Sequence, residues 1–390
     1  MRPPPPARIG ASLGTVWTPA LLVSLPRLEA NDDRMRSLLS GTGVALRPHA
    51  KAHKSGPLAL WQQSRADAAG APLAGFCAQT VREAAALLAA GCDDVLLTNE
   101  LPKHAVLRLA MLAAEHPAAM VNTLVDCPEH IEELDSAAAV CGATNLGALI
   151  EIECGQARCG CPPASDVAVA MAKQIVASER LRWGGLHVYN GAIQHTRSTA
   201  ARQAAVNVGP ASAAETTVGR LQSEGISHVP VVTGGGTGTF LQDLAAGTHT
   251  EVQPGTYLFM DGDYGANSDA SHKGFEQSLY IHTTVISSDA ASGRRVVDAG
   301  SKACDLVSGM PKATSMSDAA LATLLEGTTY SSGGDEHGVL NGVPEGALPV
   351  GSTLQLVPSH CDPTCNLHDW IVAVRDGEVE HLWEIDARGY

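Results

Sequence analysis

The sequence is short of positive charge and has no long hydrophobic run, and these two shortages exclude several classes of protein. It carries 26 Lys+Arg against 41 Asp+Glu, a formal net charge of −15, which disfavours nucleic acid or an anionic membrane as the main partner. No apolar stretch approaches the roughly 18 residues of a membrane span. The proline-rich start, MRPPPPARIG, lacks the apolar core of a signal peptide. We expect a globular cytoplasmic protein, with an organellar location as the alternative, that draws in a small anionic substrate through local positive groups.

A cysteine framework is also missing. The ten cysteines are scattered, and the C-x4-C-x-C spacing of Cys154, Cys159 and Cys161 matches none of the usual zinc or disulfide patterns. Reduced thiols in a reducing compartment are the expected state.

The sequence does contain a regular alternation of short apolar runs with longer segments of helical spacing. The runs that indicate strands are 44–49, 74–78, 94–98, 120–125, 147–153, 184–189, 228–233 and 250–257. Eight strand–helix units over about 230 residues favour a parallel (β/α)8 barrel of the TIM type, in the α/β class, over an open sheet.

Beyond about Phe275 the pattern changes to period-two runs, one of which contains an Asp-Gly pair suited to a tight hairpin. We therefore predict three parts: a loose N-terminal arm over 1–17, the barrel over 18–270, and a mainly antiparallel β domain over 271–390. The apolar run 19–25 is also able to pair with this β domain.

A barrel carries its chemistry where the chain leaves the C-terminal ends of the strands. Several unusual residues of this sequence fall at such places. They are Lys51 after the first strand, Arg158 after the fifth, Tyr189 and His195 after the sixth, TGGGTGT (233–239) after the seventh and QPGTY (253–257) at the eighth. Their shared position predicts one site at this end of the barrel.

The glycine run 233–239 is neither a P-loop nor a G-x-G-x-x-G motif, because no Gly-Lys-Ser/Thr follows and position 239 is Thr. Glycines let backbone N–H groups converge on an anion, and a helix starting near Thr239 would add its positive end. A single phosphate therefore fits better than a nucleotide, with a flexible turn as the alternative.

A lysine opposite a cradle for one phosphate points to pyridoxal phosphate. Six motifs, RPHAKAHK, GQARCG, GLHVYNGAIQH, TGGGTGT, QPGTY.FMD and PSHCDPTCNLHD, resemble those of the D-threonine aldolase and D-serine dehydratase family. That family belongs to the alanine-racemase-like (fold type III) enzymes that use pyridoxal phosphate. The resemblance runs from about Thr18 to the C-terminus.

The resemblance assigns roles to the residues at the barrel end. Lys51 is similar to the lysine that forms a Schiff base with the cofactor, whereas Lys54 does not match that position. Arg158 is similar to an arginine beside the ring, and Tyr189 to the residue facing the pyridine nitrogen. His49 and His53 flank Lys51 and either shape the pocket or simply pack, and Gln79, just after the second strand, is expected to contact the cofactor. The residues expected to share the phosphate are Thr233, Gly235, Gly236, Thr237, Gly255 and Tyr257, through N–H and hydroxyl donors.

The C-terminal stretch PSHCDPTCN separates the branches of the family. His360 and Asp362 are two apart, so on a strand both side chains would share a face and could bind one metal. The dehydratase branch resembles this stretch but has cysteine at the position of Asp362. Aspartate supplies hard oxygen, so we expect Mg²⁺ or Mn²⁺ rather than Zn²⁺. The alternative is a zinc site made of His360 with Cys361 or Cys365.

The resemblance implies retro-aldol cleavage of D-threonine and other D-β-hydroxy-α-amino acids to glycine and an aldehyde. In that mechanism His195, or water at the metal, takes the proton of the β-hydroxyl. Two rivals share the scaffold: an aldolase acting on 3-hydroxy-D-aspartate, and a dehydratase of D-serine or D-threo-3-hydroxyaspartate in which Lys51 removes the α-proton. A third is a pyridoxal-phosphate-binding protein without activity, a class that usually lacks the β domain.

We also predict a homodimer. The metal pair lies in the β domain and the cofactor in the barrel, and the class that this chain resembles closes its sites across a two-fold axis. On this interpretation the partner's β domain completes each site.

Overall fold

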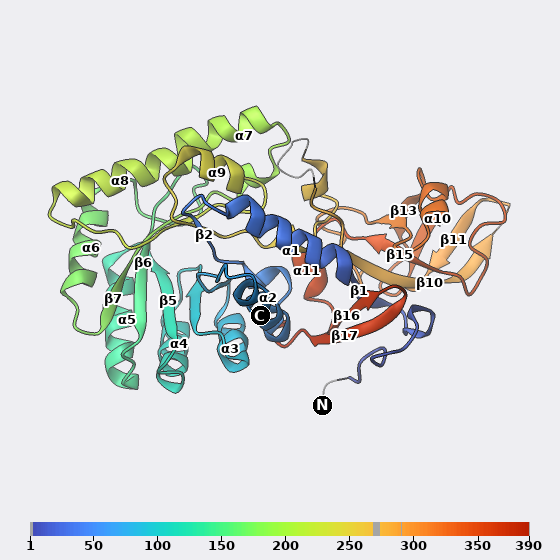
Figure 1. The fold of residues 1–390 in the computed structure, drawn as a ribbon, viewed down its shortest axis with the longest axis horizontal. Helices are drawn as coiled ribbons and strands as arrows, with labels where there is room; N and C mark the ends of the chain where they lie inside the picture. The colour runs from blue at the N-terminus through green and yellow to red at the C-terminus, as the bar shows by residue number, and fades with distance from the viewer. Residues whose placement is uncertain (1–2, 268–273, 290, 390) are drawn as a thin grey trace.

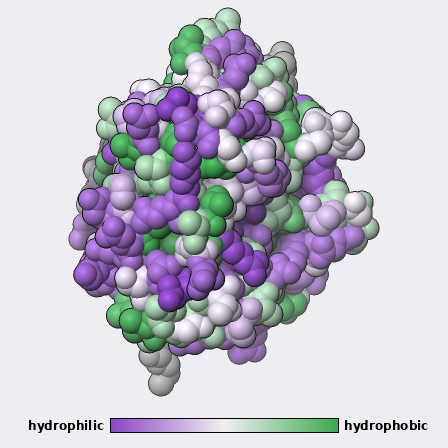
Figure 2. Space-filling model, turned by 90° about the vertical axis from the view of Figure 1, so that its left-hand side faces the viewer, coloured by the Kyte–Doolittle hydropathy of each residue, from purple (hydrophilic) through white to green (hydrophobic). Residues whose placement is uncertain are grey.

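The computed structural model describes residues 3–267, 274–289 and 291–389. In Figure 1 the chain forms two lobes side by side, a barrel surrounded by helices and a second lobe built on antiparallel strands. In the described part of the chain, no helix has both the length and the apolar character needed to cross a membrane. On the barrel end of the molecule shown in Figure 2, hydrophilic residues predominate and hydrophobic ones are interspersed, in keeping with the large net charge.

The eight predicted barrel strands are all present and parallel. They are β2 (Ala45–Leu46), β3 (Phe76–Ala78), β4 (Asp94–Leu97), β5 (Met120–Val125), β6 (Leu146–Glu151), β7 (Leu181–Val188), β8 (Val232–Gly234) and β9 (Glu251–Val252), paired in the order β2-β9-β8-β7-β6-β5-β4-β3. Two backbone hydrogen bonds close the ring between its first two strands, from Ala74 N–H to Leu46 O and from Cys77 N–H to Pro48 O, both 2.9 Å. The predicted (β/α)8 barrel is confirmed.

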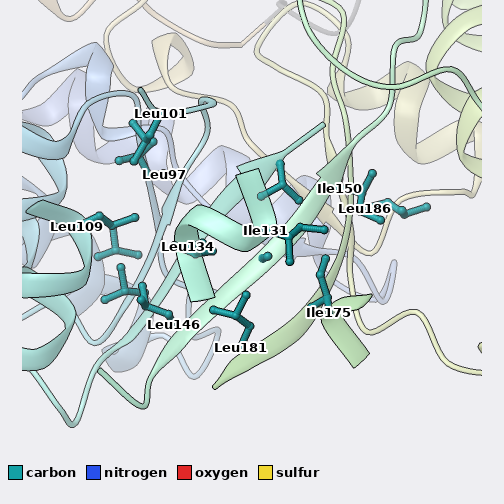
Figure 3. Close-up of a cluster of buried hydrophobic side chains, with 14 of the residues drawn as sticks. Leu97, Leu101, Leu109, Ile131, Leu134, Leu146, Ile150, Ile175, Leu181 and Leu186 are labelled. Atoms are coloured by element: carbon teal, nitrogen blue, oxygen red, sulfur yellow. The ribbon is translucent and has the colours of Figure 1, made fainter. Parts of the chain in front are cut away.

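Helices cover the outside of the barrel. They are α1 (Leu25–Leu39), α2 (Gly56–Ala68), α3 (Val81–Ala90), α4 (Lys103–Glu115), α5 (Pro128–Cys141), α6 (Asp166–Ala177), α7 (Thr199–Val206), α8 (Ser212–Ser223) and α9 (Phe240–Ala246). Figure 3 shows the layer between helices and strands, where leucine and isoleucine side chains such as Leu109, Ile131, Leu146 and Ile150 are fully or almost fully buried. This apolar layer fixes the strand ends that carry the site.

The second lobe is a sheet to which the N-terminus also contributes. Its strands are β1 (Ala20–Ser24), β10 (Leu279–Asp289), β11 (Arg294–Val297), β12 (Lys312–Thr314), β13 (Thr329–Ser332), β14 (Gly338–Asn341), β15 (Thr353–Val357), β16 (Trp370–Arg375) and β17 (Glu378–Glu384), with helices α10 (Ala319–Leu324) and α11 (Cys361–Cys365). β1 lies between antiparallel β10 and parallel β16. Asp376 and Gly377 both have positive φ, as a tight hairpin between β16 and β17 requires.

The N-terminal arm is not loose, in contrast to the prediction. Gly10 N–H donates to Val379 O and Leu13 N–H donates to Gly377 O, both at 2.8 Å. Val16 is buried. The arm is ordered because the edge of the β16–β17 hairpin offers backbone groups that need partners.

Candidate active site

Lys51 lies at the mouth of a small pocket at the C-terminal end of the barrel. It is the middle residue of a single 3₁₀ turn, η2 (Ala50–Ala52), which follows β2. The pocket is lined by His49, Lys51, Gln79, Thr98, Arg158, His187, Tyr189 and Gln253. Five residues singled out from the sequence are therefore brought together: His49, Lys51, Gln79, Arg158 and Tyr189.

Aromatic and cationic groups form one wall of this pocket. The guanidinium carbon of Arg158 lies 5.5 Å from the centroid of the Tyr189 ring. Gln79 donates from its amide to Thr98 O at 3.1 Å, and the Thr98 hydroxyl lies 3.0 Å from Nε2 of His49. Burial, together with the charge of Lys51, lowers the pKa of His49 well below its usual value, so this imidazole is neutral.

A buried polar network forms the other side of the pocket. Nε2 of His187 lies 3.2 Å from Oε1 of Gln253, and the Gln253 amide donates to the Thr233 hydroxyl at 2.9 Å. The Glu151 carboxylate lies near two residues of the pocket, 3.7 Å from Nδ1 of His187 and 3.6 Å from Nη2 of Arg158. Burial lowers the pKa of His187 to about 4, so its imidazole is also neutral at physiological pH.

The glycine turn follows β8 and packs against the segment that carries His195. Gly235 has φ +67°, in the left-handed region that favours glycine. A Cβ on Gly236 would lie 2.6 Å from Oε1 of Gln194, which is a clash. Both glycines are therefore required by the shape of a tightly packed turn.

The remaining residues of the expected phosphate group connect this turn to the loop after β9. The Thr237 hydroxyl accepts a hydrogen bond from Tyr257 N–H at 3.0 Å, and a Cβ on Gly255 would lie 2.8 Å from His49 O. The Tyr257 side chain is fully buried, and its hydroxyl oxygen accepts a hydrogen bond from the amide of Gln62 at 3.1 Å.

The metal pair predicted in the β domain meets the barrel lysine within one chain. Nζ of Lys51 lies 3.4 Å from Oδ2 of Asp362, and the two side chains are 38% and 21% exposed. Burial alone would lower the pKa of Lys51, but the Asp362 carboxylate raises it above the usual value. The ammonium and the carboxylate therefore stabilise each other at the pocket mouth.

We expected His360 and Asp362 to lie on a strand, but they do not. β15 ends at Val357, His360 is the N-cap residue of the short helix α11, and Asp362 lies in its first turn. The strand prediction is wrong because the Asp-Pro pair at 362–363 suits the first turn of a helix, where the missing N–H of proline costs nothing. His360 and Asp362 still act on one another. Burial would lower the pKa of His360, but Asp261 and, after it, the charge of Asp362 raise that pKa above its usual value.

A buried aspartate, Asp261, contacts the imidazole of His360. Nδ1 of His360 lies 3.0 Å from Oδ2 of Asp261. Asp261, His360 and Cys361 offer ligand atoms that all lie within 4.8 Å of one another. Cys361 is fully buried, its thiol contacts the Thr256 hydroxyl at 3.6 Å, and burial raises its pKa well above the usual value. The pKa of Cys365 is raised in the same way. Neither cysteine is therefore prepared as a thiolate.

His195 is held by a second aspartate from the same segment. It ends the 3₁₀ turn η3 (Ala192–His195), and its Nδ1 lies 2.5 Å from Oδ2 of Asp263. Arg197 pairs with the other oxygen of Asp263. Partial burial would raise the pKa of Asp263, but the hydrogen bond from Arg197 and the charges of His195 and Arg197 hold it below its usual value.

Lys54 has a different environment from Lys51. Its Nζ lies 2.6 Å from Oε1 of Glu83, and both side chains are almost fully buried. The other Glu83 oxygen accepts from Gln79 N–H at 2.6 Å, so Glu83 does not close a capping box with Thr80, whose hydroxyl nevertheless caps α3. Lys54 is thus committed to a structural ion pair.

The pocket presents the kinds of groups that pyridoxal phosphate needs. It offers a lysine amine at the mouth, a tightly folded glycine turn nearby, and Nδ1 of His187, which is buried and has no hydrogen-bond partner among the described residues. Such an unpaired polar atom is costly in a closed core and suits a pocket that receives a polar ring. The residues present fit the cofactor.

Sequence reasoning missed five residues of this site. Thr98, His187 and Gln253 line the pocket, and Asp261 and Asp263 hold the two histidines. His187 and Gln253 stand inside motifs that were quoted, at the ends of strands β7 and β9. Asp261 is the last residue of the quoted motif QPGTY.FMD, and Asp263 follows it after one residue, so their position after the eighth strand was an available signal.

Comparison with known proteins places both domains. Residues 23–263 match the family model of the alanine racemase N-terminal domain, and residues 278–374 match a serine dehydratase domain model. The chain is 41% identical to a D-threonine aldolase of Arthrobacter sp. (99% of this chain, 97% of the relative). It is 38% identical to a 3-hydroxy-D-aspartate aldolase of Paracoccus denitrificans (98% and 95%). The crystal structure of a D-threonine aldolase from Filomicrobium marinum superposes with a TM-score of 0.88 at 35% identity, covering 98% of this chain and 99% of the other.

Proposed function

Since the chain belongs to the family that joins an alanine racemase N-terminal domain to a serine dehydratase domain, with D-threonine aldolase among its members, we propose that it catalyses retro-aldol cleavage of D-threonine and related D-β-hydroxy-α-amino acids. The products are glycine and an aldehyde. One observation carries the proposal: the 3.4 Å approach of Lys51 to Asp362, which puts a lysine amine and a hard-oxygen ligand at one pocket.

The cofactor that suits this pocket is pyridoxal phosphate. Lys51 would hold its aldehyde carbon, Arg158 and Tyr189 would border the ring, and the turn that contains Gly235, Gly236 and Thr237 would hold the phosphate. When bound, pyridoxal phosphate supplies a sink for the electron pair left on Cα.

The second cofactor would be a divalent metal held by His360 and Asp362. One nitrogen and one carboxylate oxygen suit Mg²⁺ or Mn²⁺ with most of its water retained, and the metal would lower the pKa of the substrate hydroxyl. Zn²⁺ is the less suitable ion, because burial keeps Cys361 and Cys365 as thiols.

Lys51 and His195 would have separate roles in the reaction. Lys51 would hold the cofactor before substrate binds and would stay at the pocket mouth afterwards. His195 accepts the β-hydroxyl proton, and the Cα–Cβ bond breaks as that oxygen becomes the carbonyl of the aldehyde. His195 would then release its proton to solvent, and solvent would supply the proton that completes glycine at Cα.

The aldolase acting on 3-hydroxy-D-aspartate would use the same steps, and one relative carries that name. A dehydratase would instead use Lys51 to remove the α-proton. A binding protein without activity is disfavoured by the second domain, which carries Asp362. Glycine release from D-threonine but not from L-threonine tests the reaction and its stereochemistry; release of glycine from L-threonine alone would contradict it.

We also propose a homodimer in the cytoplasm. The chain itself brings Asp362 to Lys51, so the argument that a partner must supply the metal pair is wrong. Support comes instead from exposed apolar side chains on the second lobe, such as Val307 (98% exposed) and Met310 (48%), since association often covers such groups. Light scattering should give twice the monomer mass; a fully active monomer would contradict the proposal.

A further inference from the structure

The segment Asp261–Gly262–Asp263 contacts both histidines of the site. Asp261 pairs with Nδ1 of His360, and Asp263 pairs with Nδ1 of His195. We propose that Asp261 and Asp263 are two positioning residues with separable tasks: Asp261 prepares His360 to bind the metal, and Asp263 prepares His195 to take a proton. The inference rests on the proposed function for the role of His195, whereas the role of Asp261 can be measured without any substrate.

The surroundings of Asp261 fix the tautomer of His360. Oδ2 of Asp261 accepts from Cys361 N–H at 3.1 Å in addition to its contact with His360, and Oδ1 accepts from Tyr264 N–H at 2.9 Å. Asp261 is 1% exposed, so these partners, all of them donors, make up its environment. A carboxylate in that setting only accepts, so Nδ1 of His360 must carry the hydrogen, and Nε2 keeps the lone pair that a metal needs.

Asp263 imposes the same tautomer on His195. The His195 side chain is 44% exposed, and besides Asp263 the Tyr264 ring lies beside the imidazole, with centroids 5.1 Å apart. Asp263 is anchored by Arg197, whose guanidinium also donates to Asp263 O at 2.7 Å and to Oδ1 of Asn267 at 2.8 Å. With Nδ1 protonated and held, Nε2 of His195 is the basic atom.

The segment itself is fastened to the chain that leads to His360. Gly262 N–H donates to Pro358 O and Asp263 N–H donates to Ser359 O, both at 3.0 Å. The Tyr264 ring neighbours both imidazoles, with centroids 5.1 Å from His195 and 6.4 Å from His360. One short segment therefore sets the position of both histidines relative to each other.

The test separates the two tasks by measuring metal affinity and turnover independently. Free Mn²⁺ is followed by electron paramagnetic resonance in titrations of the holoenzyme without substrate, and turnover of D-threonine is measured at saturating Mn²⁺. Both oxygens of Asp261 face N–H donors, so in either orientation the amide of Asp261→Asn sets its NH2 group against at least one of them. The variant should weaken Mn²⁺ binding ~10–100-fold, the usual effect of losing a group that orients a metal ligand. Asp263→Asn should bind Mn²⁺ like the wild type and lose kcat by ~10²–10⁴-fold, the range for general-base catalysis.

Two controls keep the result decisive. Asp318→Asn, which caps the remote helix α10 and retains a capping oxygen, should change neither quantity. Asp263→Glu restores a carboxylate and should recover part of the kcat lost in Asp263→Asn, which a merely structural defect would not. The visible absorbance band of the lysine-bound cofactor shows whether a variant is folded. If Asp261→Asn loses this band, Asp261→Glu is measured instead, and we again expect weaker Mn²⁺ binding.

Wild-type Mn²⁺ affinity in the folded Asp261 variant would overturn the role of Asp261. Wild-type kcat in Asp263→Asn, or equal loss of Mn²⁺ affinity in both variants, would overturn the division of tasks. If the wild type itself fails to cleave D-threonine, the proposed function is wrong, and the Mn²⁺ titrations still decide whether Asp261 prepares a metal site.

Discussion

Nζ of Lys51 and Oδ2 of Asp362 lie 3.4 Å apart, although one belongs to the barrel and the other to the C-terminal domain. The relationship brings the proposed cofactor lysine and the proposed metal ligand to one pocket mouth. The two halves of the proposed chemistry should be separable, because Lys51 lies on η2 of the barrel and Asp362 lies on α11 of the C-terminal domain.

The first prediction concerns the lysine that holds the cofactor. Lys51→Ala should lose the visible absorbance band of lysine-bound pyridoxal phosphate and all measurable turnover, because it removes the amine that lines the pocket. Lys54→Met should keep the band, since Lys54 is paired with Glu83. A Lys51→Ala protein that retains both the band and turnover would show that the assignment is wrong.

The second prediction concerns metal removal. Chelation should abolish activity on D-threonine and leave the cofactor band unchanged, and added Mn²⁺ or Mg²⁺ should restore activity. Asp362→Ala should lower activity on D-threonine by at least ~10–100-fold. That is the loss typical of mutating a group that hydrogen-bonds to a metal ligand, and Asp362 is proposed to be a ligand itself.

Chelating the Asp362→Ala variant serves as its control and should cause little additional loss. Asp362→Cys should shift the metal preference toward Zn²⁺, since thiolate is the softer ligand. Full activity of wild type after exhaustive chelation would refute the metal assignment.

The third prediction concerns the buried ion pair beneath the site. Lys54→Met leaves the Glu83 carboxylate buried with Gln79 N–H as its remaining hydrogen-bond donor, and breaking a buried pair in this way costs about 3–5 kcal/mol. Lys173→Met, which breaks the exposed pair with Glu224, is the matched control and should change stability little. Equal denaturant midpoints for the two variants would contradict the prediction.

The fourth prediction is a pH dependence of stability. Burial lowers the pKa of His53 to about 4, whereas the unfolded chain has the usual value of 6.5. Between these values the unfolded state binds the proton and the folded state does not, so stability falls as pH falls, by at most about 1.4 kcal/mol per pH unit for this group. Urea unfolding between pH 6.5 and 5 should show a smaller slope for His53→Gln than for wild type; identical slopes would count against a buried neutral His53.

Much of this architecture could be predicted from the sequence because it follows from periodicity. The eight barrel runs are short, apolar and separated by helical segments, and each became a strand. The hairpin at Asp376–Gly377 followed from a turn chemistry that needs only local residues. Lys51, Gln79, Arg158 and Tyr189 met at one pocket because parallel strands bring their C-terminal ends together.

What could not be predicted depends on contacts between distant segments. The order of residues 3–17 comes from hydrogen bonds to the β16–β17 hairpin. The pairing of Asp261 with His360 and of Asp263 with His195 depends on how the chain after β9 crosses the second lobe. A pattern of spacing in one sequence does not contain that information.

The central claim is that the enzyme breaks the Cα–Cβ bond of a D-β-hydroxy-α-amino acid, and the product of D-threonine tests it most directly. The purified holoenzyme with Mn²⁺ is incubated with D-threonine, and glycine, acetaldehyde, 2-oxobutanoate and ammonia are quantified together. We predict equal amounts of glycine and acetaldehyde, formed only when the metal is present. Formation of 2-oxobutanoate and ammonia in place of glycine would contradict the account and identify a dehydratase.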